Sequence, residues 1–274
     1  MKTINGKTRI CALLGNPVEH SMSPAMHNAL FHKFGLNYRY LCFRVEPSQL
    51  KEGVHAIRTL NFLGANVTVP YKQSVIPYLD KLDPIAKKIG AVNTIVNHQG
   101  TLTGYNTDWL GFTNSLEEVY SLKNKKVVLV GAGGAARAII YGLQKRGAKL
   151  TILNRTLDKA AKLGQEFDCA YGNLQELPKI TADVLVNATI IGMSPFTKTS
   201  ILEEKNIKHF KVVYDTIYNP LETQLLKFAQ KQELICLNGL KMLVYQGGAA
   251  FKLWTQQEPD LNLMYQSALA SMQT

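Results

Sequence analysis

The sequence has few of the residues that stabilise small secreted or metal-dependent folds. Its 274 residues include only 4 cysteines, scattered singly, without a Cys-x-x-Cys pair or a cluster with histidine. A disulfide framework and a structural zinc site are therefore not expected, and we predict no bound metal. Each cysteine lies in an apolar, strand-like run, where a buried free thiol is the usual state. These cysteines are Cys11, Cys42, Cys169 and Cys236.

Long apolar runs are also absent, and no stretch approaches the length needed to span a membrane. The apolar run near the N-terminus ends at Gly15-Asn16-Pro17, which makes it too short for the core of a signal peptide. No small-residue cleavage site follows it. We therefore expect a cytoplasmic protein that has no membrane partner.

The charge balance narrows the possible partners. Hydrophobic residues make up 46% of the chain and charged residues 19%, as in globular proteins, and the length suggests about two domains. The net charge of +11 suits nucleic-acid binding, but the positive residues are dispersed and lack an aromatic-interleaved basic motif. A small anionic substrate and an anionic cofactor would be attracted by the same positive electrostatic field. We therefore expect no nucleic-acid partner.

The segment from Lys125 to Thr156 reads as strand, Gly-rich turn, helix and strand, which is the order of a dinucleotide-binding βαβ unit. In its turn, Gly131 would allow the tight bend and Gly133 the close approach of a pyrophosphate. The third small position falls on Ala136, where helix and strand must pack closely. The following helix N-terminus would offer free N–H groups to phosphate oxygens.

The end of the second strand indicates which dinucleotide binds. An NAD site usually carries Asp or Glu there, whereas this chain has Asn154-Arg155-Thr156. Arg155 is a planar, permanent cation suited to a 2′-phosphate, and no carboxylate follows until Asp158. The pattern favours NADP over NAD, and the alternative is that Arg155 is an ordinary solvated side chain.

A pair of serines precedes the first predicted helix. Pro24 fits the first helical position and Ser23 fits the N-cap. Ser21 and Ser23 beside a helix N-terminus would also make a good receptor for a carboxylate, because hydroxyl donors and free N–H groups converge there. Plain capping explains Ser23 but not Ser21, and both interpretations remain open at this point.

Polar residues cluster around the third predicted strand and the hairpin that follows it. Asn66 and Thr68 share one face of the strand, Pro70 ends the pairing, and Lys72 lies just beyond, where ligands collect in α/β sheets. The simpler interpretation of Lys72 is a solvated surface lysine. Asn93 interrupts an apolar strand and needs partners if it is buried. Asp108 follows the hairpin as a possible helix N-cap, and there we expect the chain to enter a second domain.

The second domain continues as alternating strands and helices. Three further strands are predicted at 183–187, 211–215 and 234–237, each followed by small and polar residues. Met242 and Gln246 are four residues apart and share a helix face. The predicted fold class is therefore α/β, with two α/β domains, the C-terminal one a Rossmann-type doubly wound parallel sheet.

Seven motifs in order along the chain resemble those of the shikimate dehydrogenase family, and the resemblance covers nearly the whole sequence. They include Asn-Val-Thr-x-Pro-x-Lys, Gly-Ala-Val-Asn-Thr and Gly-x-Asn-Thr-Asp-x-x-Gly. The matching segments are Gly15–Asn28, Asn66–Lys72, Gly90–Thr94, Gly104–Gly111, Asn154–Thr156, Asp215–Tyr218 and Gly239–Gln246.

The resemblance implies reversible NADPH-dependent reduction of 3-dehydroshikimate to shikimate, a step toward chorismate and the aromatic amino acids. It implies a substrate domain formed by residues 1–106 and 243–274 and an NADP domain at 107–242. Lys72 and Asp108 would be the catalytic pair. Substrate-binding residues would be Ser21, Ser23, Thr68, Asn93, Tyr218 and Gln246, with Asp108 also bonding a ring hydroxyl. NADP-binding residues would be Gly131, Ala132, Gly133, Gly134, Ala135, Asn154, Arg155, Thr156, Lys159, Thr216, Gly239 and Met242.

The chain departs from the family pattern at two positions. Pro84 stands near a position that is often acidic in the family, and Thr216 stands where many members have Met. Two other enzyme or binding functions remain to be distinguished, a broader quinate/shikimate dehydrogenase and a catalytically silent NADP-binding module. The sequence leaves both a monomer and a homodimer open.

Overall fold

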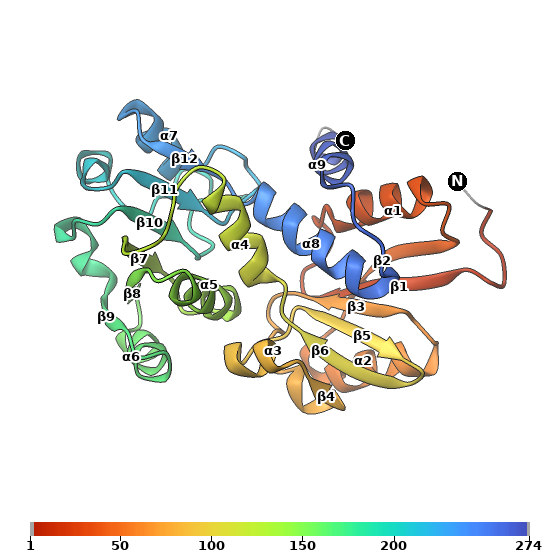
Figure 1. Ribbon diagram of the computed structural model, residues 1–274. Helices are drawn as coiled ribbons and strands as arrows, with labels where there is room; N and C mark the ends of the chain where they lie inside the picture. Colours follow the sequence, from red (N-terminus) through yellow and green to blue (C-terminus); the bar gives the residue numbers. More distant parts are fainter. Residues whose placement is uncertain (1–2, 273–274) are drawn as a thin grey trace. The chain divides into compact units, whose positions relative to one another are not determined.

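The computed structural model describes residues 3–272, and these divide into two compact units (Figure 1). The first unit contains the described residues up to Asp108 and from Val244 onward, and the second is Trp109–Leu243. The chain passes from one unit to the other within α4 (Asp108–Glu117) and returns within α8 (Leu240–Thr255). Each unit contains one six-stranded sheet, so the predicted two-domain α/β class is confirmed.

The sheet of the first unit is mixed, with the order β2-β1-β3-β5-β6-β4. β1 runs parallel to β2 and β3, whereas β5 is antiparallel to both β3 and β6. The end of β3, the start of β5 and the end of β6 therefore lie at the same edge. The strands are β1 (Arg9–Gly15), β2 (Tyr38–Arg44), β3 (Gly64–Val67), β4 (Lys81–Leu82), β5 (Thr94–His98) and β6 (Thr101–Tyr105).

Helices pack on this sheet from both parts of the chain that form the unit. α2 contributes Val54 and Ile57 to an apolar core with Ala12, Ala65 and Ile95 of the strands. α1 packs against β2 and against the C-terminal helix α9. The helical segments are α1 (Ser23–Lys33), η1 (Pro47–Gln49), α2 (Leu50–Thr59), η2 (Ile76–Tyr78), α3 (Pro84–Ile89) and α9 (Leu261–Ser271).

A single glycine lets α8 approach the sheet closely. The indole Nε1 of Trp254 in α8 donates to the carbonyl of Ile95 in β5 at 3.0 Å. A Cβ atom placed on Gly64 of β3 would lie 2.1 Å from that carbonyl oxygen and 2.5 Å from the indole nitrogen. Gly64 is therefore required where the returning chain meets the sheet.

Two local predictions from the sequence are wrong. Ser23 is the first residue of α1, and Met22 occupies the N-cap position without a side-chain cap bond. All four cysteines are free, but only Cys11 is buried, since Cys42, Cys169 and Cys236 are half-exposed.

The second unit has an all-parallel sheet with the order β12-β11-β10-β7-β8-β9. The chain starts in the centre at β7, adds strands on one side and then on the other, which is the doubly wound Rossmann arrangement predicted from the βαβ signal. The strands are β7 (Lys126–Val130), β8 (Lys149–Asn154), β9 (Ala170–Asn173), β10 (Val184–Asn187), β11 (Val212–Asp215) and β12 (Ile235–Leu237). The helices are α5 (Gly134–Lys145), α6 (Leu157–Glu166), η3 (Leu174–Lys179), η4 (Glu204–His209) and α7 (Gln224–Lys231).

Adjacent residues of β11 show that both faces of this sheet are covered. Val213 shares an apolar core with Leu225 and Leu226 of α7. Its neighbour Tyr214 points to the other face, where its ring lies 4.9 Å from that of Phe112 in α4. Burial on both faces explains why these strands read as continuous apolar runs in the sequence.

Within residues 3–272, no helix has both the length and the apolar character needed to cross a membrane. The same residues contain no group of three or more His, Cys, Asp or Glu side chains placed to hold a metal ion.

His27 is a buried titratable group in the core of the first unit. It lies in α1, is fully buried, and stacks on Tyr40 with ring centroids 4.5 Å apart. Neither ring nitrogen has a hydrogen-bond partner among the described residues. Burial lowers the pKa of His27 to about 3, so the ring is neutral in the folded protein.

We predict that replacing His27 with Phe weakens the loss of stability in acid. In the unfolded chain His27 binds a proton near the ordinary histidine pKa, whereas in the folded chain it stays neutral. His27 therefore lowers the free energy of unfolding as pH falls below about 6.5. Between about pH 7 and pH 4 the wild type should lose about 3 kcal/mol more unfolding free energy than His27→Phe in urea titrations. The matched control is His32→Gln, at an exposed histidine of the same helix. Parallel pH curves for the wild type and His27→Phe would contradict the prediction.

Candidate active site

A buried ion pair joins the two residues predicted to be catalytic. Lys72 follows β3, Asp108 begins α4, and Lys72 Nζ lies 2.6 Å from Asp108 Oδ2. The side chains retain only 15% and 6% of their exposure. The alternative that Lys72 is a solvated surface lysine is therefore wrong.

The Asn93 side chain connects this pair to helix α8. Its amide nitrogen lies 2.9 Å from Asp108 Oδ1 and 3.1 Å from the Oε1 atom of Gln246 in α8. The same nitrogen lies 2.9 Å from the hydroxyl of Thr107, so its two N–H bonds serve three acceptors. The backbone N–H of Thr107 donates to Asn93 Oδ1 at 2.7 Å, which identifies the oxygen and nitrogen of the amide. Buried Asn93 thus has the partners that its position demands.

The mixed sheet explains why these residues meet. Asn93 immediately precedes β5, and its carbonyl accepts from the N–H of Val67 at the end of β3. Its own N–H donates to the carbonyl of Tyr105 at the end of β6. Because β5 runs antiparallel to both neighbours, its first residues meet the last residues of β3 and β6. Lys72 and Asp108 follow those two strand ends.

Ser21, Ser23 and Thr68 lie beyond neighbouring strand ends of the same unit. The Ser21 hydroxyl accepts from the N–H of Ser23 at 3.2 Å, so Ser21 rather than Ser23 binds a backbone donor at the start of α1. Thr68 follows β3, and its N–H donates to the carbonyl of Leu14 in β1 at 2.9 Å. A Cβ on Gly15 would lie 2.3 Å from the Thr68 methyl group. Gly15 therefore leaves room for Thr68 at this edge.

The Gly-rich turn of the second unit has the geometry expected for a phosphate site. Gly131 has φ +122°, and a Cβ there would lie 2.7 Å from the carbonyl oxygen of Ala188, so only glycine fits. Gly133 occupies the N-cap of α5, and apart from its neighbours in the chain no atom of the described residues lies within 4 Å of a Cβ placed on it. The first-turn N–H groups at Gly134 and Ala135 have no side-chain cap at that position. Ala136 is fully buried, as close helix packing requires.

The end of β8 presents two exposed cations beside a short turn. The amide nitrogen of Asn154 donates to the Thr156 carbonyl at 2.9 Å and closes the turn between β8 and α6. Arg155 and Lys159 are exposed on this turn and on the first part of α6. Their charges are suited to a phosphate group bound at the strand end.

The turns after β10 and β11 are tied together by a buried carboxylate. Asp215 accepts from the Thr223 hydroxyl at 2.7 Å, from the Ile217 N–H at 3.1 Å and from the Asn187 amide at 3.1 Å. Burial raises the pKa of Asp215 to about 6. The bonds of Asp215 fix the segment on which Thr216 and the half-buried Tyr218 lie.

Gly239 and Met242 follow the next strand, β12, and lead from these turns into α8. The N–H of Gly239 donates to the Ile217 carbonyl at 2.9 Å. A Cβ on Gly239 would lie 2.0 Å from the carbonyl oxygen of Thr216, so the two backbones touch. Met242 follows in the first turn of α8 and is buried. The structure thus brings two of the predicted NADP-binding residues, Thr216 and Gly239, into direct contact.

Several residues that hold the site were not predicted as part of it. Thr94 donates to Asn93 Oδ1 at 3.1 Å, and Thr107 binds both ends of the same amide. The Asn106 side chain accepts from the N–H of Asp108 at 3.0 Å. The signal was present, because these residues belong to the motifs around Asn93 and Asp108. Their side-chain partners lie on other strands and leave no pattern in the sequence.

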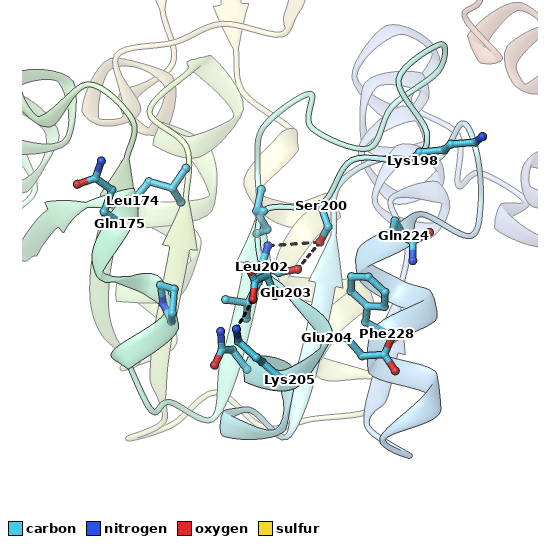
Figure 2. Close-up of a pocket in the computed structure, with 13 residues that line it drawn as sticks. Leu174, Gln175, Lys198, Ser200, Leu202, Glu203, Glu204, Lys205, Gln224 and Phe228 are labelled. Atoms are coloured by element: carbon cyan, nitrogen blue, oxygen red, sulfur yellow. Dashed lines mark hydrogen bonds and ion pairs between the residues drawn. The ribbon is translucent and has the colours of Figure 1, made fainter.

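A hollow of about 740 Å³ in the second unit is separate from these residues (Figure 2). It lies between η3, the segment 198–206 and α7, and Leu174, Leu202 and Phe228 are among its apolar lining. On its rim Lys205 pairs with Glu203 at 2.7 Å. Its lining contains none of the residues predicted for the active site, so we do not place the reaction there.

Comparison with known proteins identifies the family to which this chain belongs. The family model for the shikimate dehydrogenase substrate binding domain matches residues 13–95, and the shikimate/quinate 5-dehydrogenase model matches residues 114–217. The model for the shikimate 5′-dehydrogenase C-terminal domain matches residues 239–269.

Individual relatives match over nearly the full length. A shikimate dehydrogenase (NADP⁺) from Pyrococcus furiosus is 44% identical, covering 97% of each chain. The crystal structure of a shikimate dehydrogenase in complex with NADP⁺ superposes with a TM-score of 0.93 at 42% identity, covering 98% of this chain and 97% of the other. The Thermus thermophilus enzyme in complex with NADP(H) and shikimate gives a TM-score of 0.90 at 35% identity, with 96% and 99% covered. This protein therefore belongs to the shikimate dehydrogenase family, as its seven motifs indicate.

Proposed function

We propose that the protein catalyses the reversible NADPH-dependent reduction of 3-dehydroshikimate to shikimate, with Lys72 and Asp108 as the acid–base pair. The observation that carries the proposal is the buried Lys72–Asp108 ion pair at 2.6 Å, bordered by Asn93 and Gln246. Curated relatives that match almost the whole chain are NADP⁺ shikimate dehydrogenases. The reaction is an oxidoreduction on the path to chorismate and the aromatic amino acids.

The two units divide the work in this proposal. The proposed substrate domain is residues 1–106 and 243–274, and the proposed NADP domain is residues 107–242; their boundaries lie within two residues of those of the first and second units. Support for the first assignment comes from the match of 13–95 to a substrate binding domain. Support for the second comes from the all-parallel sheet and the Gly131–Ala135 turn at the centre of that sheet.

We assign the substrate contacts by the chemistry of each side chain. The hydroxyls of Ser21 and Ser23 bind the carboxylate of shikimate, and the start of α1 adds N–H donors. Thr68, Asn93 and Gln246 bind the ring hydroxyls, for which they have both donors and acceptors. Tyr218 lines the pocket.

The Lys72 side chain donates and accepts the proton of the reaction. In the reductive direction the carbonyl oxygen gains negative charge, and the Lys72 ammonium stabilises that charge and donates a proton to the oxygen. In the oxidative direction the neutral amine accepts the hydroxyl proton. Asp108 Oδ2 holds Lys72 Nζ in place, while Asp108 Oδ1 is fixed by the Asn93 amide. The carboxylate thereby orients both Lys72 and the reacting hydroxyl.

The residues of the second unit fit NADP, which supplies the hydride donor or acceptor when bound. The open space over Gly133 and the uncapped N–H groups of α5 suit a pyrophosphate. Arg155 and Lys159 suit the 2′-phosphate, with Asn154 and Thr156 shaping the turn between them. Thr216, Gly239 and Met242 border the nicotinamide.

The experiment that tests the function compares initial rates with four substrate and cofactor pairs. Shikimate and quinate are each oxidised with NADP⁺ and with NAD⁺, and formation of the reduced cofactor is followed by its absorbance. We expect strong turnover with shikimate and NADP⁺ only. Comparable turnover with quinate or NAD⁺ would instead identify a broader quinate/shikimate dehydrogenase. NADP⁺ binding without turnover would identify a binding module.

Replacing Lys72 with Ala should abolish most of the turnover. We expect kcat to fall by roughly 10²–10⁴-fold, the usual contribution of a positioned acid–base group, with shikimate binding largely retained. Steady-state kinetics and calorimetric titration with shikimate measure the two effects. Lys87→Ala, at an exposed lysine of α3 in the same unit, should behave like the wild type. A near-normal kcat for Lys72→Ala would remove Lys72 from the mechanism.

Replacing Arg155 with Ala should reduce the preference for NADP⁺ over NAD⁺. Loss of a charge-assisted bond to the 2′-phosphate should raise the KM for NADP⁺ by roughly 10–100-fold and leave the KM for NAD⁺ nearly unchanged. Kinetics with both cofactors at saturating shikimate measure this ratio. The matched control is Lys227→Ala, at an exposed cation of α7. If the ratio stays at the wild-type value, Arg155 is a solvated side chain and another group selects NADP.

A further inference from the structure

A chain of buried hydrogen bonds leads from the core of the first unit to the catalytic pair. The hydroxyl of Tyr40 in β2 donates to Asn66 Oδ1 in β3 at 2.7 Å. The Asn66 amide nitrogen donates to the carbonyl of Asn93 at 3.1 Å and to the Thr94 hydroxyl at 3.0 Å. Thr94 in turn donates to Asn93 Oδ1 at 3.1 Å. The last link is the bond from the Asn93 amide to Asp108 Oδ1 at 2.9 Å.

Each link of this chain is shielded from water. Tyr40 and Thr94 are fully buried, and Asn66 and Asn93 are nearly so. A hydrogen bond in such surroundings is electrostatically stronger than in water, and an unpaired group is correspondingly costly. The Asn66 amide sets the directions of these bonds, because its oxygen can only accept, from Tyr40, and its nitrogen can only donate, to the Thr94 hydroxyl.

The Tyr40 ring is held in place by aromatic stacking. His27 of α1 stacks on it, with ring centroids 4.5 Å apart and planes inclined by 10°. A Cβ on Gly247 of α8 would lie 3.6 Å from His27 Nε2, so α8 packs against the same imidazole. Tyr40 has little freedom to move its hydroxyl away from Asn66.

We propose that Tyr40 and Asn66 are positioning residues for the reaction, because they fix the Asn93 amide in the orientation that presents its nitrogen to Asp108. This inference rests on the proposed function and adds two residues to its machinery. Neither residue touches the catalytic pair, and both act through Asn93. In this proposal Asn66 positions Asn93 and Thr68 binds the substrate, although the two residues lie on the same face of one strand.

The two orientations of the Asn93 amide differ in their effect on Asp108. In the observed orientation an N–H faces the carboxylate. A flipped amide would place Oδ1 against Asp108 Oδ1 and repel it, leaving the ion pair with Lys72 less well aligned. The Thr94 hydroxyl, held by Asn66, and the Thr107 N–H both donate to Oδ1 and oppose the flip. Loss of Asn66 releases the first of these donors.

The test compares Asn66→Ala with Asn97→Ala, a matched control in the same sheet. Asn97 is also a nearly buried asparagine, but it bonds the carbonyls of Phe62 and Ile57 at 2.8 and 3.2 Å, away from Asn93. Both variants should lose stability. Only Asn66→Ala should lower kcat/KM for shikimate, by about tenfold, the value of one buried hydrogen bond, with the KM for NADP⁺ unchanged. Tyr40→Phe, which removes one hydroxyl and keeps the ring, should give a smaller fall of the same kind.

Two further measurements separate positioning from general destabilisation. In an Asn93→Ala background, Asn66→Ala should cause no additional loss of kcat/KM, because its effect is transmitted through Asn93. In protein labelled with ¹⁵N-asparagine, the side-chain NH₂ protons of Asn93 should exchange faster in Asn66→Ala than in Asn97→Ala. This second readout needs no turnover, so it judges the inference even where the proposed function fails. Equal kinetics and equal exchange in the two variants would overturn the proposal.

Discussion

The burial of the Asp108 carboxylate is the constraint on which the first unit depends. An unpaired charge in that position would cost several kcal/mol, so the fold has to bring a cation and hydrogen-bond donors to it. Lys72 supplies the cation and Asn93 the donor, and they come from parts of the chain that only a mixed sheet can place together. The antiparallel strand β5 begins where β3 and β6 end. With β5 parallel to its neighbours, Asn93 would lie at the opposite edge of the sheet.

The second unit has a different kind of sheet, and its predicted NADP-binding residues lie mainly in the turns after the strands rather than around a buried ion pair. All of its strands are parallel, so all of the turns after them leave from one edge. Those turns touch each other at glycines, as at Gly131 over Ala188 and Gly239 over Thr216. Asp215 then joins the turns after β10 and β11 through three neutral donors, and burial raises its pKa to about 6. A rim of backbone and neutral dipoles suits an extended cofactor, whereas the concentrated ion pair of the first unit suits a proton transfer.

The sequence predicted those features that depend on neighbouring residues. The βαβ unit around Gly131 has a fixed spacing of glycines between two apolar runs, and the structure has that order of elements. The strands around Asn66 and Asn93 could be placed for the same reason, since alternation and turn residues are local properties. The start of α1 was misplaced by one position, because Ser23 is a good capping residue whereas Met22, which occupies the N-cap, has no side chain that local rules would select for that position.

What the sequence could not predict was the pairing of side chains across strands. Alternation correctly placed Asn66 and Thr68 on one face of the third strand, but it could not assign them different surroundings. Asn66 pairs in register with Thr94 inside the sheet and is buried, whereas Thr68 lies beyond the last residue of β3 and is half-exposed. The difference arises because β3 ends at Val67, and the end of a strand is set by its neighbours. The polar face of such a strand therefore has an inner part, whose side chains bond other residues of the sheet, and an outer part, whose side chains can contact a ligand. The boundary between the two parts follows from sheet register, which is a non-local property.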